Sequence, residues 1–114
     1  LKANGHWVNT GFTVLQESEA ALKTAPSAAE IIVRWRKDLI RLEVLKPKGN
    51  VLVFAQNYTL ASPSLAAAVV YGRNANGMES WKDSAGDSLN KHKEIANLED
   101  EAVALLKLLK KERF

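Results

Sequence analysis

The segment from Arg73 to Lys82 holds the side chains of this chain that are best suited to binding a nucleic acid. Arg73 and Lys82 can neutralise phosphate groups. Asn74 and Asn76 can pair with an adenine edge, and Trp81 offers a face on which a base can stack. The segment is rich in turn-forming residues, and loops held by a rigid scaffold are where binding residues concentrate. We therefore predict a nucleic-acid-binding loop, with the alternative open that Trp81 is a core aromatic.

A second group of candidate binding residues lies in a basic part of the chain. The net charge is only +3, but residues 30–50 carry six basic side chains against three acidic ones. On a helix, the spacing i, i+3, i+7 places Arg34, Lys37 and Arg41 on one face. This face is either an ordinary solvated surface or a stripe that contacts phosphates. The residues expected on the opposite, buried face are Ile31, Trp35, Leu39 and Leu42.

The residue types and spacings that catalysis or metal binding requires are missing from this sequence. His6 and His92 stand alone, without a second histidine at metal-binding spacing, and the chain has no cysteine. No serine lies in a GxSxG motif, and the glycines at 72 and 77 are not followed by the Lys-Ser/Thr of a phosphate-binding loop. We therefore expect no enzyme activity, no cofactor and no metal site.

The elements expected to carry these side chains begin with a short strand over Gly11–Gln16, where residue types alternate. Ser27 and Glu30 have the spacing of a capping box and predict a helix over Ser27–Glu43. Val51–Ala55 and Tyr58–Leu60 are rich in β-forming residues and predict either a strand pair or one bent strand, at the centre of the sheet.

A second helix, Ser64–Tyr71, is almost entirely apolar and therefore expected to be buried, with Gly72 ending it in the left-handed conformation. A small hairpin is expected around Trp81 and Leu89. The fold class is thus α+β, with a small antiparallel sheet and two central helices. The residues expected in the core are Leu45, Val51, Val53, Phe54, Leu65, Val69 and Val70.

A long C-terminal amphipathic helix is predicted from about Lys91, because apolar residues recur there at spacings of three and four. This apolar seam could pair with a copy of itself or with a neighbouring domain, so the sequence also allows a protein-interaction or homodimerisation module. The seam residues are Ile95, Leu98, Ala102, Leu105 and Leu109.

The run from Ser62 to Asp83 resembles the signature of domain-of-unknown-function family 4357, in which SPSAAA, GR, NG and WK follow one another. It is similar also to the RAMA domain, named for its association with restriction enzymes and adenine methylases. The resemblance covers about Gly11 to Leu89; Glu17 and Met78 depart from the usual pattern. The resemblance implies a non-catalytic module that recognises DNA, with modified DNA as a more specific form of that ligand, and that is attached to a nuclease or a restriction-modification protein.

The expected organisation follows from this coverage. Residues 1–10 form an N-terminal connection, residues 11–89 the domain, and residues 90–114 the C-terminal helix. The chain lacks an initiator methionine and a signal pattern, so we interpret it as a piece of a longer protein. No apolar run approaches the length of a membrane span, and we expect a cytoplasmic location.

Overall fold

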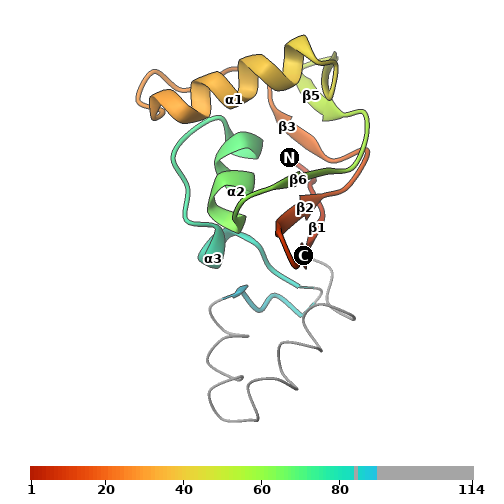
Figure 1. Ribbon diagram of the computed structural model, residues 1–114, viewed down its shortest axis with the longest axis vertical. Coiled ribbons are helices and arrows are strands. Elements are labelled where there is room, and N and C mark those ends of the chain that lie inside the picture. The colour runs from red at the N-terminus through yellow and green to blue at the C-terminus, as the bar shows by residue number, and fades with distance from the viewer. Residues whose placement is uncertain (84, 90–114) are drawn as a thin grey trace.

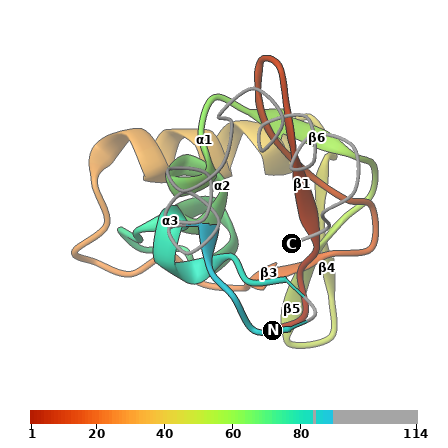
Figure 2. The same ribbon diagram turned by 90° about the horizontal axis from the view of Figure 1, so that it is seen from below.

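The computed structural model describes residues 1–83 and 85–89 and has the expected α+β class (Figure 1). The predicted C-terminal helix, with its seam from Ile95 to Leu109, lies outside these residues. Helices gather on one side of the molecule and strands on the other (Figure 2). The elements are β1 (Gly5–Val8), β2 (Gly11–Val14), β3 (Glu19–Ala21), α1 (Glu30–Arg41), β4 (Leu45–Lys48), β5 (Val51–Phe54), β6 (Tyr58–Leu60), α2 (Pro63–Tyr71) and α3 (Gly77–Ser80).

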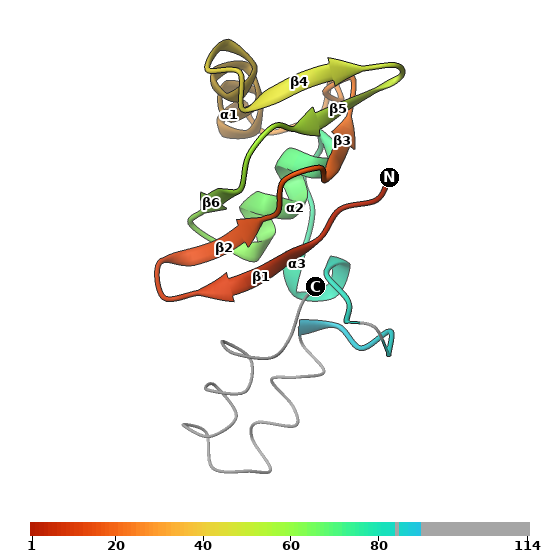
Figure 3. The same cartoon turned by 90° about the vertical axis from the view of Figure 1, so that its right-hand side faces the viewer.

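The strands form two antiparallel sheets of three strands each, where the sequence predicts a single sheet (Figure 3). The first sheet has the order β1-β2-β6 and the second has the order β3-β5-β4. β5 is the central strand of its sheet, as expected. β5 and β6 nevertheless belong to different sheets, so they form neither a pair nor one bent strand. The side chain of Asn57, between them, accepts a hydrogen bond from the backbone N–H of Gln16 (2.7 Å) at the end of β2.

Three strands have no clear signal in the sequence. β1 lies within the stretch predicted as a connection, and β3 lies in a polar, alanine-rich stretch. β4 contains Pro47, which is opposite Leu52 of β5. Because β4 is an edge strand, the missing N–H of this proline interrupts no second ladder. Short strands with such composition are held by their pairing and not by local propensity.

Helix α1 begins at Glu30, three residues later than predicted, and the capping box does not form. Its N-cap is Ala29, which makes no side-chain capping bond. The predicted inner face is right for Leu39, which is buried, and in part for Trp35, which is half-buried, but it is wrong for Ile31 and Leu42. Ile31 and Leu42 are each 57% exposed, whereas Ile32, Arg36 and Leu39 are buried.

The reason for the different inner face of α1 is Arg36, which is only 1% exposed. Its Nε donates to Thr24 Oγ1 (2.8 Å), and its terminal nitrogens donate to the carbonyl oxygens of Ala21 and Val69. The guanidinium therefore joins α1 to β3 and α2. In a hydropathy pattern an arginine is assigned to the exposed side of a helix. Because Arg36 is buried, the buried face of α1 lies partly on a different side from the predicted one.

Helix α2 agrees with its prediction. The Ser62 side chain caps it by accepting from the backbone N–H of Leu65 (3.1 Å), Pro63 occupies its first turn, and Gly72 ends it with φ of 69°. The helix contacts α1, α3 and strands of both sheets, so it is the central element of the core. In the part of the chain that the structure describes, no helix has the length and apolar character to cross a membrane.

The core follows the prediction in its main points. Leu45, Phe54, Val69 and Val70 are buried as expected. Val51, Val53 and Leu65 are only half-buried. The two valines alternate with buried Leu52 and Phe54 along β5, so one face of this strand lies toward the core and the other toward the outside.

A candidate nucleic-acid interface

Trp81 lies in the core. Its side chain is 6% exposed, its ring centroid lies 4.6 Å from that of Phe12, and its indole Nε1 donates to the carbonyl oxygen of Pro63 (2.9 Å). The indole therefore contacts both β2 and the first residue of α2 and holds these two elements together. Of the two roles that the sequence leaves open for Trp81, these contacts support the role of a core aromatic.

The Asn76-Gly77 pair holds the short helix α3 against the start of α2. Asn76 caps α3 by accepting from the backbone N–H of Met78 (3.0 Å), and the N–H of Gly77 donates to Ser64 Oγ (3.0 Å). A Cβ at Gly77 would lie 2.1 Å from the carbonyl carbon of Pro63, so a glycine is required there. The Asn76-Gly77 pair and the start of α2, both part of the Ser62–Asp83 signature, are therefore packed directly against each other.

Asn74 links the loop after α2 to the start of α1. Its Oδ1 accepts from the backbone N–H of Ala29 (2.9 Å), the residue that precedes the first turn of α1. Bidentate pairing with adenine uses both the oxygen and the nitrogen of an asparagine amide. Because Asn74 and Asn76 already use their oxygens for backbone bonds, a base-edge role for either would compete with the fold.

Arg73 and Lys82 are exposed, as a phosphate-binding role requires. The guanidinium carbon of Arg73 lies 4.6 Å from the ring centroid of Tyr71, a cation–π contact that restrains this long side chain. Lys82 forms an antiparallel bridge with Ser88, in agreement with the small hairpin expected around Trp81 and Leu89.

The predicted basic face of α1 is exposed, which both interpretations of it require. Arg34, Lys37 and Arg41 are all exposed, and Arg41 lies 3.6 Å from Asp38 in an exposed ion pair. Such a pair contributes little to stability, so it leaves Arg41 able to exchange partners. Of the six basic residues between 30 and 50, Arg36 alone is buried.

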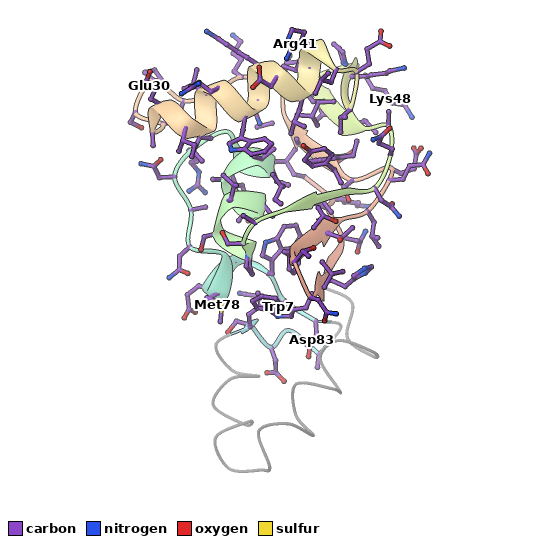
Figure 4. The ribbon with its side chains drawn as sticks, in the orientation of Figure 1. Trp7, Glu30, Arg41, Lys48, Met78 and Asp83 are labelled. Atoms are coloured by element: carbon purple, nitrogen blue, oxygen red, sulfur yellow. The ribbon has the colours of Figure 1, made fainter. Side chains whose placement is uncertain are left out.

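Two further cations extend this face, and the sequence reasoning did not single them out. Lys46 and Lys48 lie on the edge strand β4, which contacts α1, and both are exposed. Figure 4 shows Arg41 and Lys48 at the same end of the molecule. The signal that could have found them is the concentration of basic residues in 30–50, once the turn at Gly49 is recognised as a hairpin. We call Arg34, Lys37, Arg41, Lys46 and Lys48 the α1–β4 basic surface.

The predicted site residues do not form one compact cluster. Glu30 and Arg41 lie at opposite ends of α1, and Asn74 bonds the loop to the Glu30 end (Figure 4). Lys46 and Lys48 follow the Arg41 end. The loop and the α1–β4 basic surface are therefore two separate areas, with α1 running from one toward the other. Within residues 1–83 and 85–89, no group of three or more His, Cys, Asp or Glu side chains could hold a metal ion.

Comparisons with known proteins point to one family. The family model described as "Domain of unknown function (DUF4357)" matches residues 1–93. Searches of curated proteins and of solved structures gave no match. The match includes all nine elements described above and the whole Ser62–Asp83 signature. The chain therefore belongs to the DUF4357 family.

Proposed function

We propose that this domain is a non-catalytic DNA-binding module that serves a nuclease or a restriction-modification protein in the cytoplasm, and that it is related to the RAMA domain. The observation that carries the proposal is the α1–β4 basic surface, in which five exposed cations come from two elements in contact. Resemblance to modules attached to DNA-processing enzymes supports the same function, and recognition of modified DNA is its more specific form.

The spacing of the cations on α1 suits a DNA strand. Residues 34 and 41 are separated by about 10 Å along a helix axis, close to the rise of three nucleotides along one strand of duplex DNA. Arg34, Lys37 and Arg41 lie on one face of α1, so together they can reach phosphates within one short stretch of a DNA strand. Lys46 and Lys48 extend the contact beyond the end of the helix, and Arg73 and Lys82 supply phosphate contacts at the other area.

The affinity expected from such a surface is modest and depends on salt. Contacts to phosphates release counterions, so the affinity falls steeply as salt rises. A domain that reaches only a few phosphates binds with a Kd on the order of micromolar or weaker, the range of non-specific binding.

Fluorescence anisotropy at several salt concentrations tests the proposal, with duplex, single-stranded and adenine-methylated oligonucleotides. An Arg34→Ala, Lys37→Ala variant should weaken binding of every sequence and make the slope of log affinity against log salt shallower by about one for each lost phosphate contact. The matched control pairs the single variant Lys37→Ala with Lys23→Ala, which removes the same charge from an exposed lysine outside the α1–β4 basic surface. Absence of binding by the wild type, or equal weakening by these two single variants, would contradict the proposal.

A second candidate function, protein interaction, is favoured by the flank of α1 beside its basic face. Ile31 and Leu42 are exposed there, and Trp35 between them is half-buried against Tyr58 (ring centroids 6.3 Å apart). Binding through such a flank, or through the predicted C-terminal seam, would be nearly indifferent to salt, whereas DNA binding would not. The same salt series therefore separates the two functions.

A further inference from the structure

A cleft of about 220 Å³ lies between the segment that precedes β1, helix α2, the last residue of α3 and the two residues that follow it. Val70 and Trp81 form part of its wall and are almost fully buried, so this part is a rigid apolar floor. Tyr71, Ser80 and Lys82 also line it, and each carries a polar group on a side chain that is exposed or half-buried. The cleft therefore combines an apolar floor with a polar rim.

The charge at the rim is positive. Lys82 lines the cleft, and Arg73 lies against the ring of Tyr71, which also lines it. The lining residues that the structure describes include no carboxylate. Asp83 is the next residue along the chain, but its Oδ1 accepts from the backbone N–H groups of Ala85 and Asp87 (2.9 Å each). The rim thus favours a ligand that carries a negative group.

The size of the cleft limits the ligand to one small ring system. Pockets for drug-sized ligands usually measure about 300–1,000 Å³, which is larger than this cleft. A base inside a duplex is covered by its stacked neighbours, and it can enter a pocket only from a single strand or after leaving the stack. The ligand must fit an apolar floor, carry a negative charge for the rim and be small. A single nucleotide, with its flat base joined to a phosphate, is the part of DNA that meets these three conditions.

We propose that this cleft binds one unstacked nucleotide of DNA, with the base over the apolar floor and the adjoining phosphate between Lys82 and Arg73. This inference rests on the proposed DNA-binding function. The hydroxyl groups of Tyr71 and Ser80 can each donate and accept, so they can serve any of the four bases. The cleft therefore selects for an unpaired nucleotide more than for a sequence.

The test compares three fluorescent probes by anisotropy: a fully paired duplex, the same duplex with one unpaired nucleotide, and the matching single strand. The wild type should bind the two probes with unstacked nucleotides about tenfold more tightly than the paired duplex. Free deoxynucleoside monophosphates should displace these probes at concentrations at which inorganic phosphate does not, since phosphate alone lacks the base. Equal displacement by both would mean that the cleft holds only the anion and would overturn the proposal.

Two variants locate the effect in the cleft. Ser80→Phe fills the cleft from its half-buried rim and should abolish the preference while leaving binding of the paired duplex unchanged. Thr10→Phe places the same ring on the exposed turn between β1 and β2 and should keep the preference. Lys82→Glu, at an exposed position, tests the same point without adding bulk and should weaken the unpaired-nucleotide probe more than the paired duplex.

The outcomes separate this inference from the function on which it rests. If the wild type binds the paired duplex in a salt-dependent way but shows no preference, the cleft assignment fails and DNA binding stands. If Ser80→Phe and Lys82→Glu both keep the preference, the unpaired nucleotide binds elsewhere and the assignment fails as well. If none of the probes binds, both proposals fail together.

Discussion

At the scale of single residues, the most consequential side chain is one that the sequence presents as ordinary. Burial lowers the pKa of the Arg36 guanidinium below its usual range, because the charged form loses its hydration. Arginine nevertheless stays protonated in proteins, so the core holds a cation at neutral pH. Its bonds to Thr24 Oγ1 and to two backbone carbonyls supply the oxygen partners that a buried charge needs.

A pair of glycines with the same backbone conformation tests how closely the fold is built around this cation. Gly72 and Gly49 have φ of 69° and 63°, but a Cβ at Gly72 would lie 2.7 Å from the Lys23 carbonyl oxygen and 3.1 Å from Arg36 Cζ, whereas one at Gly49 would meet nothing within 4 Å. Gly49→Ala should cost about 1–2 kcal/mol for the left-handed conformation alone. Gly72→Ala should cost about 1–3 kcal/mol more because of the crowding.

Urea unfolding followed by circular dichroism measures both free energies. Gly49→Ala is the matched control, because it carries the strain without the contact. Equal losses in the two variants would show that the neighbourhood of Arg36 tolerates a methyl group and would contradict the crowding.

The sequence shows which side chains of the candidate site have the chemistry for binding bases. It does not show that the fold uses several of them for its own contacts. Sequence reasoning selected Asn74, Asn76 and Trp81 because their side chains can recognise bases, and the fold uses all three to join its own segments. Their partners are backbone groups whose nearness depends on tertiary structure, so no local pattern reveals them. Arg73 and Lys82 are exposed, as their predicted role in phosphate binding requires, and that role stays a prediction.

At the scale of elements, α1 and α2 differ in whether the residues that cap their ends lie near them in the sequence. The cap of α2 and its terminal glycine are contiguous with the helix, so the sequence predicts both ends. The residue before α1 is bonded by Asn74, which lies 45 residues further along the chain. A capping box between Ser27 and Glu30 was therefore a reasonable but wrong prediction, because it assumed a local partner.

The predicted C-terminal helix, which lies outside the described residues, gives a prediction that rests on the sequence alone. Its seam is too apolar to be left bare in water, so it should be covered by the domain or by another chain. Leu98→Glu with Leu105→Glu should therefore lower the melting temperature or dissociate an oligomer. Differential scanning calorimetry and light scattering measure the two effects, and unchanged melting together with unchanged mass would contradict the prediction.

At the scale of the whole molecule, the sequence predicts the class and misses the division into two sheets. The strands have three or four residues each, too few for a periodic pattern to show which face is buried. Their pairing joins residues as distant in sequence as Phe12 and Leu60. Only the packing of both sheets around α2 decides which strands become neighbours.

The stability of the whole molecule should depend on this central helix. Val69→Asp places a carboxylate at a position with no exposure, which costs several kcal/mol, comparable with the roughly 5–15 kcal/mol that hold a typical domain together. We expect the domain to unfold, with loss of its near-ultraviolet circular dichroism. Ile40→Asp makes a similar change on the exposed side of α1 and should leave the domain folded. A cooperatively melting Val69→Asp domain would contradict the central role of α2.

The interleaving of the two sheets affects how the chain folds while it is being made on the ribosome. The chain leaves the first sheet after Val14 and returns to it only at Tyr58, having built the second sheet in between. At about 5–20 residues per second, this interval lasts roughly 2–9 s. During that time β2 lacks its partner β6 and presents an open hydrogen-bonding edge. Those seconds of translation are when the nascent chain is most open to pairing with other polypeptides.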